Sequence, residues 1–245
     1  MASLRAALLA EVHPGFDIER MAVRLSDFIH RSSASNGFIT FFFGELDRRT
    51  GELRYINAGH NPPFVARRTG GFAALGTSGF PLGMFPGANY EPGTVRLDEG
   101  DTAVLFTDGI TEARNGAREE YSEERLRGAV AGHPELAARE LCRAVLEEAH
   151  AFACATEPSD DITLVVVKRN PGLGSSWATQ SPFPHDFPAF HSSAQARWRA
   201  SRARGYLSLI SRIAKNASWG ISTLPTRRMR FLPSFCFSRT FILRV

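Results

Sequence analysis

The chain contains two stretches in which acidic residues meet an apolar strand, LFTDGITEA at residues 105–113 and PSDDITLVVV at residues 158–167. In the first stretch an apolar run ends at Asp108, and in the second an apolar run begins after Asp160 and Asp161. If two such strands are antiparallel neighbours, the end of one lies beside the start of the other. Asp108 and Asp160 would then meet at one sheet edge, where two carboxylates repel unless a cation separates them. The two stretches therefore predict a divalent metal at the edge of a sheet.

An Asp-Gly corner such as Asp108–Gly109 suits this chemistry, because it frees the carboxylate and lets a neighbouring backbone carbonyl face the same site. Mg²⁺ and Mn²⁺ bind oxygen ligands of this kind. Two such ions can share a water molecule, lower its pKa and direct it at a phosphorus atom. The alternative is that Asp108–Gly109 is an ordinary turn and Asp160–Asp161 a solvated strand start. Each stretch alone is compatible with that alternative, whereas the two together favour metal binding.

The composition divides the chain into an acidic domain and a basic tail. A length of 245 residues suits one or two domains with a full core. Residues 171–245 hold 11 of the 29 Lys and Arg residues but one of the 25 Asp and Glu residues, so they carry +10 and the first 170 residues carry −6. The three cysteines show no CxxC spacing, which argues against a disulfide framework or a zinc site. Without a membrane-length apolar run or a good signal peptide, the cytoplasm is the expected location.

Hydrophobic periodicity predicts a mostly antiparallel sheet structure layered with helices, an α+β fold. The expected helices cover residues 3–10, 17–31 with Asp17 as N-cap, 122–131, and 134–152 with Pro134 in the first turn. The expected strands cover residues 38–46, 52–57, 64–67, 72–75, 94–97, 102–107 and 162–168, the first two joined by a loop that ends at Gly51. Because residues 38–46 are apolar on both faces, we expect that strand to be covered on both faces.

Three further features have both a functional and a structural interpretation. His60, in the stretch NAGHNPP at residues 57–63, is either a metal ligand or general acid near a phosphate, or a histidine that pins its loop. The absence of a second His or Cys at ligand spacing favours the loop role. Arg114 is either a phosphate ligand or a solvated side chain, and a lone arginine favours the latter. The glycine-rich residues 76–84 lack the ending of a P-loop and predict a loop over one edge of the sheet.

The region from Ser3 to about Arg169 resembles the metal-dependent PPM-type serine/threonine phosphatases, in the bacterial SpoIIE/RsbU-like branch that dephosphorylates anti-anti-sigma-type regulators. The matching stretches are FITFFFG (38–44), NAGHNPP (57–63), PLG (81–83), LFTDGITEA (105–113) and DDIT (160–163).

This resemblance implies a four-layer α/β/β/α sandwich with two Mn²⁺ or Mg²⁺ ions between the sheets and a phosphorylated protein as substrate. It implies that Asp108 is a metal ligand, that Gly109 contributes its carbonyl, and that Asp160 takes the place of the late metal ligand. His60, Asn61 and Asp161 would lie around this site, and no residue is assigned a further catalytic role.

The chain also departs from the pattern of this family. Neither a Gly-Asp-x-x-Asp strand nor an Asp-x-x-Gly-His-Gly corner occurs in the sequence. We therefore expect residues 1–169 to be a partial, N-terminally truncated domain that lacks its first strands, has unpaired sheet edges and has little or no phosphatase activity.

We recognise no family motif in the basic tail, residues 170–245. We expect it to be a disordered extension, with binding to nucleic acid or to an anionic membrane as the alternative. A short basic amphipathic helix over residues 206–216 is the only element predicted in it. Three functions therefore stay open: a phosphatase, a non-catalytic partner-binding remnant of the same fold, and an adaptor that acts through the tail. No nucleic acid partner is expected for the domain itself.

Overall fold

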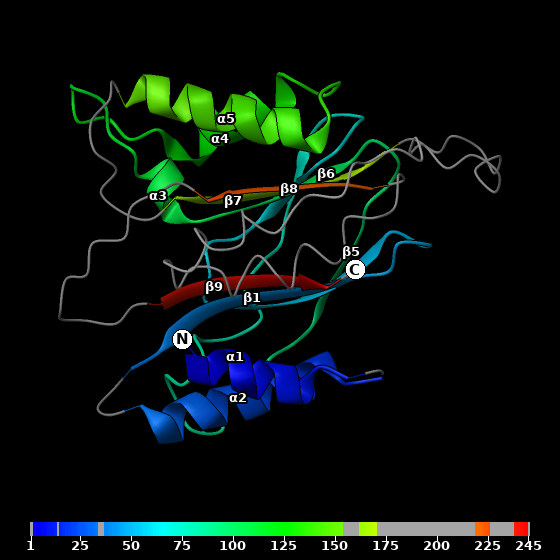
Figure 1. Ribbon diagram of the computed structural model, residues 1–245, viewed down its shortest axis with the longest axis vertical. Coiled ribbons are helices and arrows are strands. Elements are labelled where there is room, and N and C mark those ends of the chain that lie inside the picture. The colour runs from blue at the N-terminus through cyan, green and yellow to red at the C-terminus, as the bar shows by residue number, and fades with distance from the viewer. Residues whose placement is uncertain are drawn as a thin grey trace, which may run out of the picture.

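The computed structural model describes residues 2–13, 15–33, 37–153, 162–170, 219–225 and 238–244, which form two β-sheets packed face to face between two layers of helices (Figure 1). In chain order the elements are α1 (Ala2–Glu11), α2 (Ile18–Ser32), β1 (Ile39–Leu46), β2 (Glu52–Ala58), β3 (Phe64–Ala66), β4 (Phe72–Ala74), β5 (Gly93–Arg96), β6 (Thr102–Phe106), α3 (Asp108–Thr111), α4 (Ser122–Ala131), α5 (Ala138–Phe152), β7 (Thr163–Arg169), β8 (Trp219–Pro225) and β9 (Ser238–Arg244). Sheet A has the strand order β5-β2-β1-β9, and sheet B has the order β4-β3-β6-β7-β8. The predicted α+β class and four-layer sandwich are confirmed.

Strand β1 shows how the sequence produces the layers. Phe41 and Phe43 pack against the helices α1 and α2, whereas Phe42 packs in the space between the two sheets. All three residues are at most 1% exposed. Successive side chains of a strand point to opposite faces, so this apolar run fills two separate cores. The prediction that this strand is covered on both faces is confirmed.

The helices cover the outer faces of the sheets through apolar stripes. In α2 the stripe consists of residues at helical spacing, and the Asp17 carboxylate caps the helix by accepting hydrogen bonds from the Glu19 and Arg20 backbone amides, at 2.9 and 3.0 Å. Helices α4 and α5 pack on sheet B, over the alternate β6 and β7 residues Val104, Phe106, Leu164 and Val166. No helix in the described part of the chain is both long and apolar enough to cross a membrane.

The helix predicted over residues 134–152 begins four residues later, at Ala138. The amine of Lys168, in β7, donates hydrogen bonds to the backbone carbonyls of Pro134 and Leu136, the latter at 2.8 Å. These two carbonyls are therefore bonded to β7. Glu140 instead starts the helix, because its carboxylate accepts a hydrogen bond from the Ala137 amide at 3.2 Å. The contact of Lys168 with residues 134 and 136 thus outweighs the tendency of Pro134 to start a helix.

Two segments of the tail are strands that pair with the edges of the sheets, a pairing that the sequence did not predict. Residues Trp219–Pro225 form β8 on the edge of β7, and residues Ser238–Arg244 form β9 on the edge of β1. The physical reason is that an exposed strand edge offers a row of backbone donors and acceptors to any segment able to pair with it. The helix predicted over residues 206–216 lies outside the described residues.

Candidate metal site

The end of β6 and the start of β7 lie side by side, as the sequence predicted. The two strands are antiparallel, with Phe106 opposite Leu164. Beyond this pair, the Thr107 amide donates to the Thr163 carbonyl at 3.1 Å, and the Thr163 amide donates to the Thr107 hydroxyl at 2.9 Å. Asp108 therefore comes directly after Thr107, the residue that is hydrogen-bonded to the first residue of β7. Asp160 and Asp161, which precede this strand in the sequence, lie outside the described residues.

Asp108 lies in a single helical turn, the four-residue α3. It is the first residue of α3, after Thr107 in extended conformation, and it is 7% exposed. Its backbone carbonyl accepts hydrogen bonds from the Glu112 amide at 2.8 Å and from the Thr111 hydroxyl at 3.3 Å. Gly109 is buried in the same turn. The turn thus fixes the backbone from which the Asp108 carboxylate projects.

The loop that carries His60 and Asn61 lies at the same end of sheet B. Strand β3 begins at Phe64 and pairs antiparallel with β6, so residues just before β3 lie level with residues just after β6. His60 is 3% exposed, and its amide donates to the Asn57 side-chain oxygen at 2.9 Å. Asp108, the start of β7 and the His60 loop therefore lie at one end of sheet B, which we call the site end.

Asn57 organises this loop, a role that the sequence analysis did not assign. It is fully buried at the end of β2, and its side-chain nitrogen donates to the Leu75 carbonyl at 3.1 Å. Its backbone exchanges hydrogen bonds with Ser78: the Asn57 amide donates to the hydroxyl at 3.0 Å, and the Ser78 amide donates to the Asn57 carbonyl at 2.7 Å. An asparagine three residues before His60, where a strand ends, is a signal for such a local cap.

The glycine-rich loop of residues 76–84 lies against sheet A and helix α2, in agreement with the predicted loop over a sheet edge. The Gly83 amide donates to the Ser26 hydroxyl at 3.0 Å, and the His30 Nδ1 lies 2.9 Å from the Gly83 carbonyl oxygen. Tyr90 also donates to the Ser26 hydroxyl at 3.0 Å. Burial raises the pKa of Tyr90 above its usual value, which keeps the hydroxyl protonated as a donor. The loop therefore has a fixed position beside the His60 corner.

Arg114 lies on the surface, in agreement with the solvated alternative. Its guanidinium forms an ion pair with the Glu120 carboxylate at 2.7 Å, across a short surface turn in which both side chains are about half exposed. A hydrogen bond from the guanidinium to this carboxylate raises the pKa of Arg114. The Arg114 side chain therefore connects the two sides of this surface turn.

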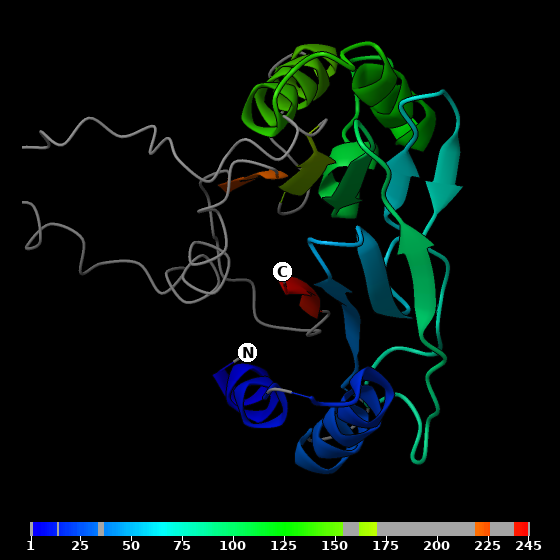
Figure 2. The same cartoon turned by 90° about the vertical axis from the view of Figure 1, so that its right-hand side faces the viewer.

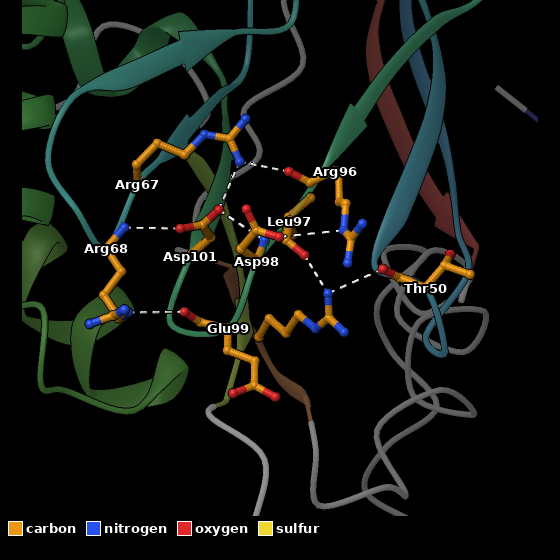
Figure 3. A network of polar contacts seen from close by, with 9 residues as sticks. Thr50, Arg67, Arg68, Arg96, Leu97, Asp98, Glu99 and Asp101 are labelled. Carbon is orange, nitrogen blue, oxygen red and sulfur yellow. Dashed lines mark hydrogen bonds and ion pairs between the residues drawn. The ribbon is translucent and has the colours of Figure 1, made fainter.

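The opposite end of β6 carries a second buried aspartate, Asp101, in a network that joins the sheets (Figure 3). Its carboxylate accepts hydrogen bonds from the Arg67 guanidinium at 2.7 Å and from the Arg68 and Asp98 amides, both at 2.9 Å. Arg67, which follows β3 of sheet B, also donates to the carbonyl of Arg96 in β5 of sheet A, at 2.6 Å.

Arg169 makes a second connection at this end of the sandwich. It is the last residue of β7, and its guanidinium donates to the Leu97 carbonyl at 2.6 Å and to the Thr50 carbonyl at 3.2 Å. Thr50 belongs to the turn between β1 and β2, so the contact again joins sheet B to sheet A (Figure 3). We refer to these contacts of Asp101, Arg67 and Arg169 as the clamp.

The residues at the site end fit a metal site in part. Asp108 offers a buried carboxylate at a strand end, the type of oxygen ligand that Mn²⁺ and Mg²⁺ bind. Within the described ranges, no group of three or more His, Cys, Asp or Glu side chains is placed to hold a metal ion. A binuclear centre would therefore take further ligands from outside those ranges, and Asp160 is the candidate that follows from the sequence.

Solved structures with a similar architecture define the class of fold. The RsbU and RsbW domains of a Mycobacterium tuberculosis protein match with a TM-score of 0.53 and 25% identity, over 68% of this chain and 46% of that one. The phosphatase domain of the cell fate determinant SpoIIE from Bacillus subtilis matches with a TM-score of 0.51 and 16% identity, over 70% and 76%. The PP2C domain of SiaA from Pseudomonas aeruginosa matches with a TM-score of 0.53 and 16% identity, over 66% and 65%. The fold is therefore that of the PP2C-type, or PPM, phosphatase domains.

The chain belongs to the SpoIIE family, whose model, described as stage II sporulation protein E, matches residues 1–170. Protein IcfG of Synechocystis sp. is 32% identical over 151 residues, which cover 61% of this chain and 24% of IcfG. The phosphoserine phosphatase RsbU of Bacillus subtilis is 26% identical over 172 residues, which cover 69% of this chain and 50% of RsbU. The matched regions thus span half or less of these curated relatives. The resemblance inferred from the motifs is confirmed.

Proposed function

We propose that residues 1–169 form a metal-dependent protein serine/threonine phosphatase domain that hydrolyses a phosphoester on a bacterial signalling regulator of the anti-anti-sigma type. The proposal is carried by the meeting of Asp108, the start of β7 and the His60 loop at one end of sheet B. Membership of the SpoIIE family and the similarity to the phosphoserine phosphatase RsbU support the class of reaction.

In this proposal Asp108 and Asp160 hold Mn²⁺ or Mg²⁺ through their carboxylates, and Gly109 adds its backbone carbonyl. When bound, such ions lower the pKa of water and place it against phosphorus. The burial of Asp108 strengthens its attraction for a cation, because charges interact more strongly where little water surrounds them. His60, Asn61 and Asp161 shape the surrounding loops, and the hydrogen bond from the His60 amide to Asn57 fixes one of these loops.

We further propose that the 245-residue chain turns over its substrate slowly. Its sequence contains neither a Gly-Asp-x-x-Asp nor an Asp-x-x-Gly-His-Gly motif, the two sources of further carboxylates in the family pattern. Two carboxylates on one side of a site suit one weakly held ion better than a bridged pair. A bridged pair of ions is the arrangement that clamps both the attacking and the leaving oxygen of a phosphoester.

The test is a phosphatase assay of the purified chain, with a phosphoserine peptide and millimolar Mn²⁺, beside Asp108→Asn and Asp98→Asn. Asp98 is a suitable control because its exposed side chain lies near the clamp, at the opposite end of β6. We expect slow Mn²⁺-dependent turnover that Asp108→Asn reduces by about 100-fold or more and Asp98→Asn leaves unchanged. Equal turnover in all three proteins would contradict the role of Asp108, whereas fast turnover by the unmodified chain would contradict the expected impairment.

A further inference from the structure

Strands β9 and β8 each form one edge of a sheet, with β5 and β4 at the opposite edges. Strand β8 pairs antiparallel with β7 over residues 163–169, and β9 pairs parallel with β1 over residues 39–45. Figure 2 shows the two strands on the same side of the sandwich, β8 beside sheet B and β9 beside sheet A. We refer to β8 and β9 together as the arm.

The edges that the arm covers belong to strands whose side chains are already buried on both faces. In β1, Phe41 and Phe42 lie on opposite faces and are fully buried. In β7, Val165 and Val166 likewise lie on opposite faces and are at most 2% exposed. An open row of backbone donors and acceptors next to such strands is costly if it is shielded from water, and prone to association if it is not. A strand that pairs with each of these edges therefore stabilises the domain.

The sequence of the arm suits this position. Residues 240–243 (Thr-Phe-Ile-Leu) are strand formers that lie between Arg239 and Arg244. Strand β8 ends at Pro225, and a proline at the end of a strand removes no hydrogen bond from the interior of the sheet. Opposite net charges, +10 for residues 171–245 and −6 for residues 1–170, also favour association of the tail with the domain.

We propose that the edges of β1 and β7 are strand-acceptor sites and that their occupant is the arm of the same chain. The mode is the addition of an extended segment to a sheet edge, in which backbone hydrogen bonds supply the affinity. The contact reaches the candidate metal site, because Pro225 pairs with Thr163, the residue that is also bonded to Thr107 beside Asp108. The arm therefore also stabilises the start of β7.

The backbone amides of β1 can report on the pairing with β9, because they face β2 and β9 alternately. The Asp47 amide donates to the Glu52 carbonyl at 2.9 Å, so by alternation the amides of Phe41 and Phe43 face β2. The amides of Phe42 and Gly44 consequently face β9. The parallel register, with Phe42 opposite Phe241, directs the backbone N–H of Ile242 toward β1.

The test is hydrogen exchange by NMR on the full chain and on the variants Ile242→Pro and Ile242→Ala. Proline removes the backbone donor, whereas alanine keeps it, so the pair separates backbone pairing from side-chain effects. We expect Ile242→Pro to accelerate exchange at Phe42 and Gly44 by about tenfold or more relative to Ile242→Ala. Exchange at Phe41 and Phe43 should change by less than about threefold, because these amides remain bonded to β2.

Two results would overturn the proposal. Equal exchange at Phe42 and Gly44 in the two variants would show that β9 does not occupy this edge. Protection of these amides in a protein that light scattering finds to be a dimer would show that a second chain donates the arm, whereas a monomer supports the proposal. If Ile242→Pro unfolds the domain, Ser222→Pro and Ser222→Ala repeat the test on β7, where the amides of Leu164 and Val166 face β8.

Discussion

Two buried aspartates lie at the two ends of β6, and their surroundings differ. Asp101, just before the strand, receives hydrogen bonds from the Arg67 guanidinium and the Arg68 amide, within a clamp that joins the sheets. Burial raises the pKa of Asp101, but these donors, the Asp98 amide and the charge of Arg67 outweigh burial and hold the pKa below its usual value. Asp108, just after the strand, starts α3 beside the first residue of β7.

The comparison separates a structural carboxylate from a candidate ligand. At the Asp101 end the fold itself supplies the cation and the donors, so the charge is satisfied locally. At the Asp108 end the fold brings a carboxylate to a strand start that follows two further acids, Asp160 and Asp161, in the sequence. One strand of five residues thus connects a part of the molecule that serves stability with a part that we assign to function.

The largest expected effect on stability is at the clamp. Asp101→Asn should lower the free energy of unfolding by about 3 kcal/mol, because it leaves the half-buried Arg67 without its counter-charge. Urea unfolding at neutral pH measures this change. Asp98→Asn is the control, since its ion pair with Arg96 is exposed and should leave the unfolding midpoint almost unchanged. Equal effects of the two substitutions would remove the distinction between clamp and surface.

Asn57 tests the architecture of the site end. Asn57→Ala should lower the free energy of unfolding by about 2 kcal/mol, because the Leu75 carbonyl and the His60 amide lose their buried hydrogen-bond partner. Urea unfolding again gives the value, and NMR shifts should change around His60 rather than around Asp101. Changes spread over the whole domain would contradict a local role for Asn57.

The contribution of Asp101 should also depend on pH. A carboxylate whose folded pKa lies below its unfolded value of about 3.9 stabilises the fold above that value and loses this effect as the pH falls through the folded pKa. The difference in unfolding midpoint between the unmodified chain and Asp101→Asn should therefore be constant from pH 7 to about pH 5 and shrink toward pH 3. A difference that grows on acidification would show the opposite shift of pKa.

The smallest effect is expected at Arg114. Its ion pair with Glu120 is exposed, so Arg114→Ala should leave the urea midpoint and Mn²⁺ binding unchanged within the error of the measurement. A clear loss of Mn²⁺ binding or of phosphopeptide turnover would instead support a phosphate-binding role for Arg114.

The sequence predicted those features that depend on neighbours along the chain. The alternation of Phe41, Phe42 and Phe43 predicted a strand between two cores, and Asp17 predicted the start of α2. The apolar runs that end at Asp108 and begin after Asp161 predicted the pairing of β6 with β7.

Features that need distant segments were not predicted. The clamp joins Asp101 to Arg67, and the true start of α5 depends on Lys168, more than 30 residues away in each case. Strands β8 and β9 depend on the edges of β7 and β1, which the sequence of the tail does not display. Such contacts follow from the topology of the sheets, and local patterns carry little information about it.

The central claim, that the two ends of β6 differ in their capacity for a ligand, is tested most directly by Mn²⁺ binding. The signal of free Mn²⁺ in electron paramagnetic resonance gives the bound fraction for the unmodified chain, Asp98→Asn and Asp108→Asn. We predict one weakly bound Mn²⁺ in the first two proteins and none in Asp108→Asn, with the fold of all three intact by circular dichroism. Equal binding in all three proteins, or no binding by the unmodified chain, would contradict the assignment of Asp108 as a metal ligand.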